Sequence, residues 1–219
     1  YRNTPYFPSY IASSFHQMEN LARSRKADVR PLSWSFVFRG ERCFEGTRAY
    51  QTQGIDKPVF HFFRMAAMLG EEEIALRSDG AQDRSTQENP WTSDLAPEVD
   101  GYATSSEDSV EVFLYSHHDN QWERQQDRDV RINLTNLPFE TAEMTMWILD
   151  EDHCNSYTAW QAMGSPLYPE GDEKSALIEA GVFKPAIKDE DLAVDAREAS
   201  VSVTMSTHSL VLMKITRKK

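Results

Sequence analysis

The segment DHCNSYTAWQAMGSP, residues 152–166, concentrates side chains that could do chemistry. Because histidine titrates near neutral pH, His153 is a candidate metal ligand or catalytic base. The same segment also contains groups that build local structure: Asn155 and Ser156 can close a turn, and Gly-Ser-Pro can end a helix. Trp160 can bury such a helix against a neighbouring domain. We therefore interpret the segment as structural, with these residues docking one domain onto another.

Other polar clusters fit simple structural explanations. His117 and His118 are adjacent on a strand-like run, so their side chains point to opposite faces and cannot chelate one metal ion together. The acidic runs 71–73 and 189–191 are typical of solvated charge, and the carboxylates of 150–152 have no recognisable cleft beside them. Serine nucleophile motifs, glycine-rich phosphate loops and metal-ligand spacings are absent from the sequence. We therefore expect no catalytic residue, no metal site and no cofactor in these residues.

Composition and charge exclude several function classes. The net charge of −12 argues against nucleic acid as a partner, because a phosphate-binding surface needs concentrated lysine and arginine. No stretch approaches the roughly 20 apolar residues that a membrane helix requires, so we expect no membrane partner. Cys43 and Cys154 are too far apart for a zinc knuckle or a disulfide framework. Free thiols slightly favour the cytoplasm as the compartment.

The first seventy residues have a helix–strand–helix rhythm. Apolar residues recur at helical spacing over 6–21, and the run VRPLSWSFVF (29–38) has the length and composition of a strand. The run KPVFHFFRMAAMLG (57–70) predicts a second helix, with Pro58 in its first turn and Gly70 as its C-terminal cap. One such unit cannot close a barrel. We therefore expect the end of a larger α/β domain whose beginning lies outside this sequence.

The remainder of the chain is typical of an all-β domain. Strand-like runs occupy residues 72–78, 109–118, 129–137 and 142–152. The runs ASVSVTMS (199–206) and SLVLMKITR (209–217) alternate apolar and polar residues around a short link, which predicts a hairpin. The polar, proline-containing stretch 81–103 predicts an exposed excursion. Short strands with polar turns of this kind predict an antiparallel sandwich over 71–219.

Three segments, 4–12, 31–70 and 152–166, resemble in their sequence and their order along the chain the glycoside hydrolase family 39, which includes β-xylosidases and α-L-iduronidases. The segment from Pro31 to Gly70 is similar to the last strand, last long loop and last helix of the catalytic barrel, and GIDKPVFHFFRMAAMLG is close to the xylosidase type. TPYFPSYIA (4–12) is similar to the helix before that strand, and 152–166 resembles a signature of the C-terminal β domain. The resemblance implies the last strand and helices of a (β/α)8 barrel over 1–70, followed by an antiparallel β-sandwich accessory domain over 71–219.

The resemblance also implies retaining glycoside hydrolysis, which uses two carboxyl groups about 5–5.5 Å apart. In the family both glutamates precede the segment that matches 4–12, and neither motif occurs in this sequence. We therefore expect the chain to be inactive alone. Its parent protein is expected to release terminal β-linked xylose from xylo-oligosaccharides. The expected partners are the oligosaccharide and the upstream part of the barrel, with a homo-oligomer left open.

Four residues gain a sugar-binding role from the resemblance. Trp34 matches the family tryptophan at the end of the last strand, where an indole can face the apolar side of a pyranose. Arg39 stands where relatives commonly carry glutamate, and arginine cannot accept hydrogen bonds. Either Glu41 takes over that role, which we favour, or the substrate differs from plain xylose. Phe44 belongs to a Phe-x-Gly-x-Arg run for which a structural role fits at least as well.

Two alternatives stay open at this point. The chain could be a non-catalytic carbohydrate-binding or interaction module. Such a module would, however, expose the apolar helix at the end of a barrel whose other strands and helices are missing. It could also belong to a glycosidase of changed specificity, iduronidase-like or arabinosidase-like, which Arg39 favours. Xylan binding without hydrolysis would support the first alternative. A panel of aryl glycosides separates the second from a xylosidase.

Overall fold

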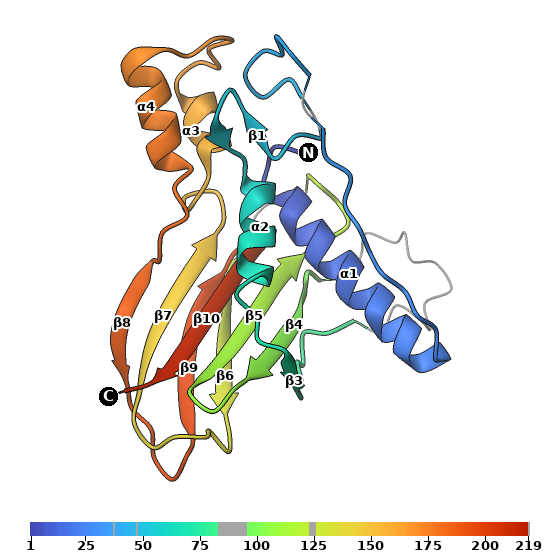
Figure 1. Cartoon of the computed structure of the whole chain (residues 1–219), viewed down its shortest axis with the longest axis vertical. Helices are drawn as coiled ribbons and strands as arrows, with labels where there is room; N and C mark the ends of the chain where they lie inside the picture. The colour runs from blue at the N-terminus through green and yellow to red at the C-terminus, as the bar shows by residue number, and fades with distance from the viewer. Residues whose placement is uncertain (37, 47, 83–95, 123–125, 219) are drawn as a thin grey trace.

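A computed structural model describes residues 1–36, 38–46, 48–82, 96–122 and 126–218. Figure 1 shows a large sheet in the middle of the molecule, two helices across one face and a small sheet behind the other face. Two further helices form a lobe at one end. Among the described residues, no helix is long and apolar enough to cross a membrane.

The large sheet is antiparallel throughout and has the order β3–β4–β5–β10–β7–β8. Its strands are β3 (Glu72–Ile74), β4 (Glu98–Ser105), β5 (Ser109–His117), β7 (Ala142–Leu149), β8 (Ile187–Leu192) and β10 (Ser209–Arg217). The small sheet pairs β6 (Arg128–Leu134) with β9 (Ala199–Met205). A third, minor pair joins β1 (Gln51–Thr52) to β2 (Ile55–Asp56).

The alternation of β10 shows how the large sheet is covered on both faces. Val211, Met213 and Ile215 face the small sheet, where they pack with residues of β6 and β9. Leu210 and Leu212 point to the opposite face and pack with the helices. A strand covered on both faces is expected to be apolar at almost every position, as β10 is. These two layers of packed sheet confirm the predicted antiparallel sandwich.

The predicted hairpin of the last two strands is wrong. β9 pairs with β6 in the small sheet, whereas β10 pairs with β5 and β7 in the large one. The link at Ser206–His208 therefore carries the chain from one sheet to the other. The alternation of apolar and polar residues fits a hairpin and also fits two strands in different sheets, because each strand of a sandwich turns one face to the shared core.

The prediction for residues 81–103 was also wrong at its end. Residues 98–105 form β4, which lies between β3 and β5 in the large sheet. Its acidic residues and its glycine are typical of a polar loop, which is why the sequence did not predict a strand here. In the structure Glu98 and Asp100 are buried, because they make polar contacts with a helix. The middle of the predicted excursion, residues 83–95, lies outside the described residues.

The two predicted helices of the N-terminal part are present. α1 spans Tyr6–Arg25, and α2 spans Pro58–Ala66 with Pro58 in its first turn. Gly70 does not cap α2, which ends four residues earlier; its N–H instead donates to Thr104 Oγ1 at 2.9 Å. Residue 70 lies in the link between α2 and β3, and the domain boundary expected there stays a prediction.

The predicted strand over 29–38 is not formed by its described residues. A strand requires a neighbour that completes its backbone hydrogen bonds, and residues 29–36 and 38 pair with no other described segment. Besides the short pair β1–β2, two elements were not predicted at all. They are α4 (Gly171–Ala180), which packs with α3 (Ser156–Ala162), and the acidic edge strand β8, whose residues 188–191 are exposed.

Buried aromatic rings tie α1 to the end of the large sheet. The ring of His208, only 8% exposed, lies 4.9 Å from the Tyr6 ring and 5.5 Å from the His117 ring, centroid to centroid. Burial, followed by the neighbouring His117 charge, lowers the pKa of His208 from 6.5 to about 3. Neutral His208 is therefore part of the folded interface.

We expect the chain to lose stability in mild acid because of this histidine. Between pH 6.5 and 3, His208 is protonated in the unfolded chain but neutral in the folded one. The free energy of unfolding therefore falls as the pH is lowered. The expected loss is about 2 kcal/mol by pH 5 and about 3 kcal/mol by pH 4. Urea titrations at several pH values measure it. His208→Asn suits the left-handed backbone (φ 64°) and cannot titrate, so its stability should depend less steeply on pH. Equal slopes in both proteins would contradict the assignment.

Candidate functional site

The loop after the 29–38 segment is anchored from several directions. Its Cys43 N–H donates to Leu167 O at 2.9 Å, and its Phe44 N–H donates to Thr52 Oγ1 at 2.9 Å. Asn3 Nδ2 donates to Phe44 O at 2.7 Å. Two distant parts of the chain, at Asn3 and Leu167, and the nearby Thr52 thus fix the loop. A fixed loop can hold functional groups in one geometry.

Phe44, one of the four predicted sugar-binding residues, lies inside the structure. Its ring is 5% exposed and contacts the rings of Tyr157 and Trp160 at centroid distances of 5.2 and 5.1 Å. Its φ of 58° places it in the left-handed region, which packing against these rings stabilises. This placement favours the structural role, because so little of the ring is open to a ligand.

The contacts of residues 152–166 confirm that this segment docks two parts of the chain. Asn155 caps α3 by accepting hydrogen bonds from the N–H groups of Tyr157 and Thr158, at 3.0 and 3.2 Å. Ser156 Oγ donates to the carbonyl oxygen of Asp56, the last residue of β2. Together with the Phe44–Trp160 ring contact, these bonds join the lobe of α3 and α4 to the candidate loop.

His153 lies at the edge of that segment and away from the buried contacts. Its Nδ1 is 2.8 Å from Asp150 Oδ1, and its side chain is 48% exposed. The Asp150 carboxylate also accepts the His153 backbone N–H at 2.8 Å, so the pair closes a surface turn. This geometry agrees with the structural interpretation of the segment.

The segment before the loop presents a row of exposed apolar side chains. Trp34 is 70% exposed and Phe38 60% exposed. Phe36 lies edge-on to Phe38 at 5.1 Å between centroids, and the Arg48 guanidinium lies 5.7 Å from the centroid of the Phe36 ring. Apolar surface concentrated in this way is normally covered, either by a ligand or by a further part of the protein. Indole and phenyl faces are suited to the apolar faces of sugar rings.

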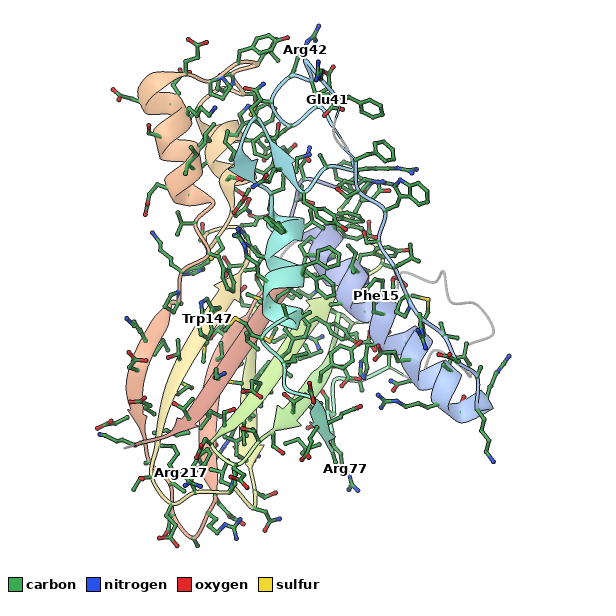
Figure 2. The ribbon with its side chains drawn as sticks, in the orientation of Figure 1. Phe15, Glu41, Arg42, Arg77, Trp147 and Arg217 are labelled. Atoms are coloured by element: carbon green, nitrogen blue, oxygen red, sulfur yellow. The ribbon has the colours of Figure 1, made fainter. Side chains whose placement is uncertain are left out.

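Arg39 and Glu41 lie at the two ends of a short turn after this row. Arg39 is exposed, and its guanidinium forms no ion pair with any described residue. Glu41 is half-buried, and Gln53 Nε2 donates to its carbonyl oxygen at 3.2 Å. Figure 2 shows Glu41 beside Arg42 at the end of the molecule where the α3–α4 lobe lies. No hydrogen bond, ion pair or ring contact joins Trp34 to either Arg39 or Glu41.

Sequence reasoning missed Lys57, which lies beneath this loop. The side chain is 0% exposed, and its Nζ donates a hydrogen bond to Gly46 O. Burial lowers the pKa of Lys57 from 10.5 to about 8, although the Glu41 carboxylate opposes the shift. The only feature of the sequence that could have pointed to Lys57 was its position before Pro58 in the segment GIDKPVFHFFRMAAMLG, which resembles the family. Among the residues that the structure describes, no group of three or more His, Cys, Asp or Glu side chains is placed to hold a metal ion.

A family comparison decides what this arrangement belongs to. The model of glycosyl hydrolases family 39 matches residues 1–195, which is most of the chain. The chain belongs to glycosyl hydrolases family 39. Among curated proteins, none matches it.

Solved structures of family 39 enzymes share the fold of this chain. A monomeric beta-xylosidase from Caulobacter crescentus CB15 superposes with a TM-score of 0.75 at 17% identity, over 100% of this chain and 42% of its own. The GH39 enzyme from Xanthomonas axonopodis pv. citri has a TM-score of 0.72 at 14% identity, over 99% and 42% of the two chains. A bacterial orthologue of human α-L-iduronidase has a TM-score of 0.73 at 15% identity, over 99% and 39%. This chain therefore spans about two fifths of the length of the solved structures it matches.

Proposed function

We propose that this chain is the C-terminal part of a retaining glycosidase that releases terminal β-linked xylose from xylo-oligosaccharides. The observation that carries the proposal is the match to the family 39 model over residues 1–195, in a chain that places Trp34 on a row of aromatic side chains. The two catalytic carboxylates of the retaining reaction would come from the upstream part of the protein. The chain alone would hydrolyse nothing.

The 32–41 segment would supply one wall of the sugar site. Trp34 would stack on the apolar face of the terminal pyranose, and its match to the family tryptophan at the end of the last barrel strand supports this role. Glu41 would accept hydrogen bonds from sugar hydroxyl groups, which Arg39 cannot do. Phe44 would contribute by holding the loop rather than by touching the sugar, because its ring is packed between Tyr157 and Trp160.

A second specificity has one observation in its favour. The guanidinium of Arg39 is exposed and pairs with no described carboxylate, so it is available to a charged ligand. A planar guanidinium binds a carboxylate through two parallel hydrogen bonds, which suits the carboxylate of a uronic acid. One structural neighbour is titled an orthologue of α-L-iduronidase. A glycosidase acting on uronides is therefore the alternative to a xylosidase.

Hydrolysis of aryl glycosides by the intact protein tests the proposal. We expect an aryl β-D-xyloside to be cleaved with a kcat/KM at least about tenfold above that of aryl α-L-iduronide or α-L-arabinoside. The 219-residue chain assayed alone should cleave none of them. Preference for the iduronide, lost on Arg39→Ala, would favour the alternative. Binding of xylan by the intact protein without any hydrolysis would overturn both and favour a non-catalytic module.

A further inference from the structure

The backbone of Lys57 is fixed so that its side chain has one direction. Lys57 is the N-cap residue of α2, and its φ of −89° and ψ of 156° are the extended values that a following proline requires. Its N–H donates to Tyr50 O at 3.0 Å, and its carbonyl accepts the Phe60 N–H at 3.0 Å. The four-carbon side chain leaves this anchored position and runs entirely inside the protein, with 0% of the residue exposed.

The Lys57 ammonium reaches the turn that carries Glu41. Nζ donates to Gly46 O and lies 5.9 Å from the centroid of the Phe44 ring. The ionisable groups that face it are the Glu41 carboxylate and the Cys43 thiol. A buried ammonium is stable only where hydrogen bonds and an opposite charge replace water. Gly46 O supplies the hydrogen-bond acceptor, and Glu41 supplies the charge.

The Glu41 carboxylate in turn packs directly on Gly46. A Cβ atom added to Gly46 would lie 2.2 Å from Glu41 Oε2 and 3.1 Å from Oε1, so any larger residue here would displace the carboxylate from this position. One face of Gly46 therefore holds Glu41, while its carbonyl oxygen binds Lys57. The three residues form a compact group that we call the Lys57 node.

We propose that Lys57 is a positioning residue, whose ammonium holds the Glu41 carboxylate against Gly46 in the orientation that accepts hydrogen bonds from sugar hydroxyl groups. The inference rests on the proposed function, since it names the residue that shapes that site. Lys57 has no exposed surface and does not touch the sugar; it acts through Glu41.

The node makes sugar binding sensitive to alkaline pH. Burial lowers the pKa of Lys57 to about 8, and Glu41 works in the opposite direction. Below this pH the ammonium is charged and holds the carboxylate. Above it the proton is lost, the attraction ends, and Glu41 is free to turn away. Because the sugar hydroxyl groups are bound alike in the ground state and the transition state, the loss falls on KM and leaves kcat largely unchanged.

Steady-state kinetics of the intact protein on its best aryl glycoside, from pH 6 to 10, test the proposal. Lys57→Met should raise KM about tenfold at pH 7 with little change in kcat, as expected when Glu41 loses the nearby opposite charge that orients it. Lys57→Arg keeps its charge throughout the range, so it should restore most of the binding and remove the rise in KM above pH 8. Lys57→Met should add nothing in a Glu41→Gln background, because both changes remove the same interaction. Lys184→Met, at an exposed lysine paired with Glu179, is the matched control and should leave KM unchanged.

Equal loss of kcat and of thermal stability in Lys57→Met, without a change in KM, would overturn the proposal and leave Lys57 a purely structural residue. NMR titration of ¹⁵N-labelled lysine in the intact protein gives a readout that needs no turnover. Glu41→Gln should lower the pKa of Lys57 further, and an unchanged pKa would also overturn the proposal. A protein that cleaves no glycoside but keeps this coupling contradicts the proposed function, while the hold of Lys57 on Glu41 stands.

Discussion

Gly101→Ala is expected to lower the free energy of unfolding by about 4 kcal/mol or more, enough to prevent folding of a marginally stable chain. Gly101 lies in β4 opposite Leu114 of β5. A Cβ atom at this position would lie 1.9 Å from Phe113 O and 2.9 Å from Phe113 C. These are backbone atoms of a central strand, so no side chain can rotate to make room. Glycine within a strand often marks such a close approach of two backbones.

Urea denaturation of the chain measures this effect. Ser105→Ala is the matched control, since it adds no atom to the same strand and should change the free energy of unfolding by less than about 0.5 kcal/mol. β5 cannot yield, because it pairs on its other side with β10 and carries Phe113 into the core beneath α2. A Gly101→Ala protein as stable as the control would show that β4 and β5 lie farther apart than described.

Trp34→Ala is expected to lower kcat/KM of the intact protein on aryl β-xylosides by about 100-fold, which corresponds to roughly 3 kcal/mol of binding free energy. The proposed role of Trp34 is to stack on the sugar, and an indole that becomes buried on binding contributes on this scale. Trp34 is 70% exposed in this chain, so its removal leaves no cavity in the core described here. Steady-state kinetics and thermal unfolding should be measured on the same preparation.

Leu32→Ala provides the comparison for Trp34→Ala. Leu32 lies on the same segment and is 77% exposed, but it has no aromatic face to offer a sugar. We expect it to keep kcat/KM within about threefold of the parent value. Equal losses in the two variants would indicate that the segment packs against protein rather than against substrate. That outcome would remove Trp34 from the proposed sugar site.

Helices α1 and α2 and the sandwich were predictable because their patterns do not depend on distant contacts. The apolar face of α1, the Pro58 start of α2 and the dense apolar run of β10 each identify an element on their own. β4 escaped because Glu98 and Asp100 are buried by partners on α1, which no local pattern reveals. The pairing of β9 with β6 is likewise a long-range choice. Alternation specifies which side chains face the core and not which strand lies alongside.

The candidate site rests on the family resemblance, and its sugar-binding role stays a prediction. Trp34 and Arg39 are exposed, as a ligand-binding role requires, but nothing in their spacing alone identifies them. Phe44 looked equally suitable, and only the contacts with Tyr157 and Trp160 show that its ring is occupied. Lys57 could not be found from sequence, because its importance lies in complete burial beside Glu41 and Gly46. Sequence patterns list charged residues without showing which of them lose their contact with water.

The most direct test of the central claim is the stereochemistry of the sugar that the intact protein first releases. ¹H NMR of the anomeric region during cleavage of an aryl β-D-xyloside distinguishes the β-anomer of xylose from the α-anomer before the two equilibrate. A retaining glycosidase that contains this chain should release β-xylose first, followed by slow appearance of the α-anomer. Release of α-xylose first would show inversion, and no release of xylose at all would show that the parent protein is not a xylosidase.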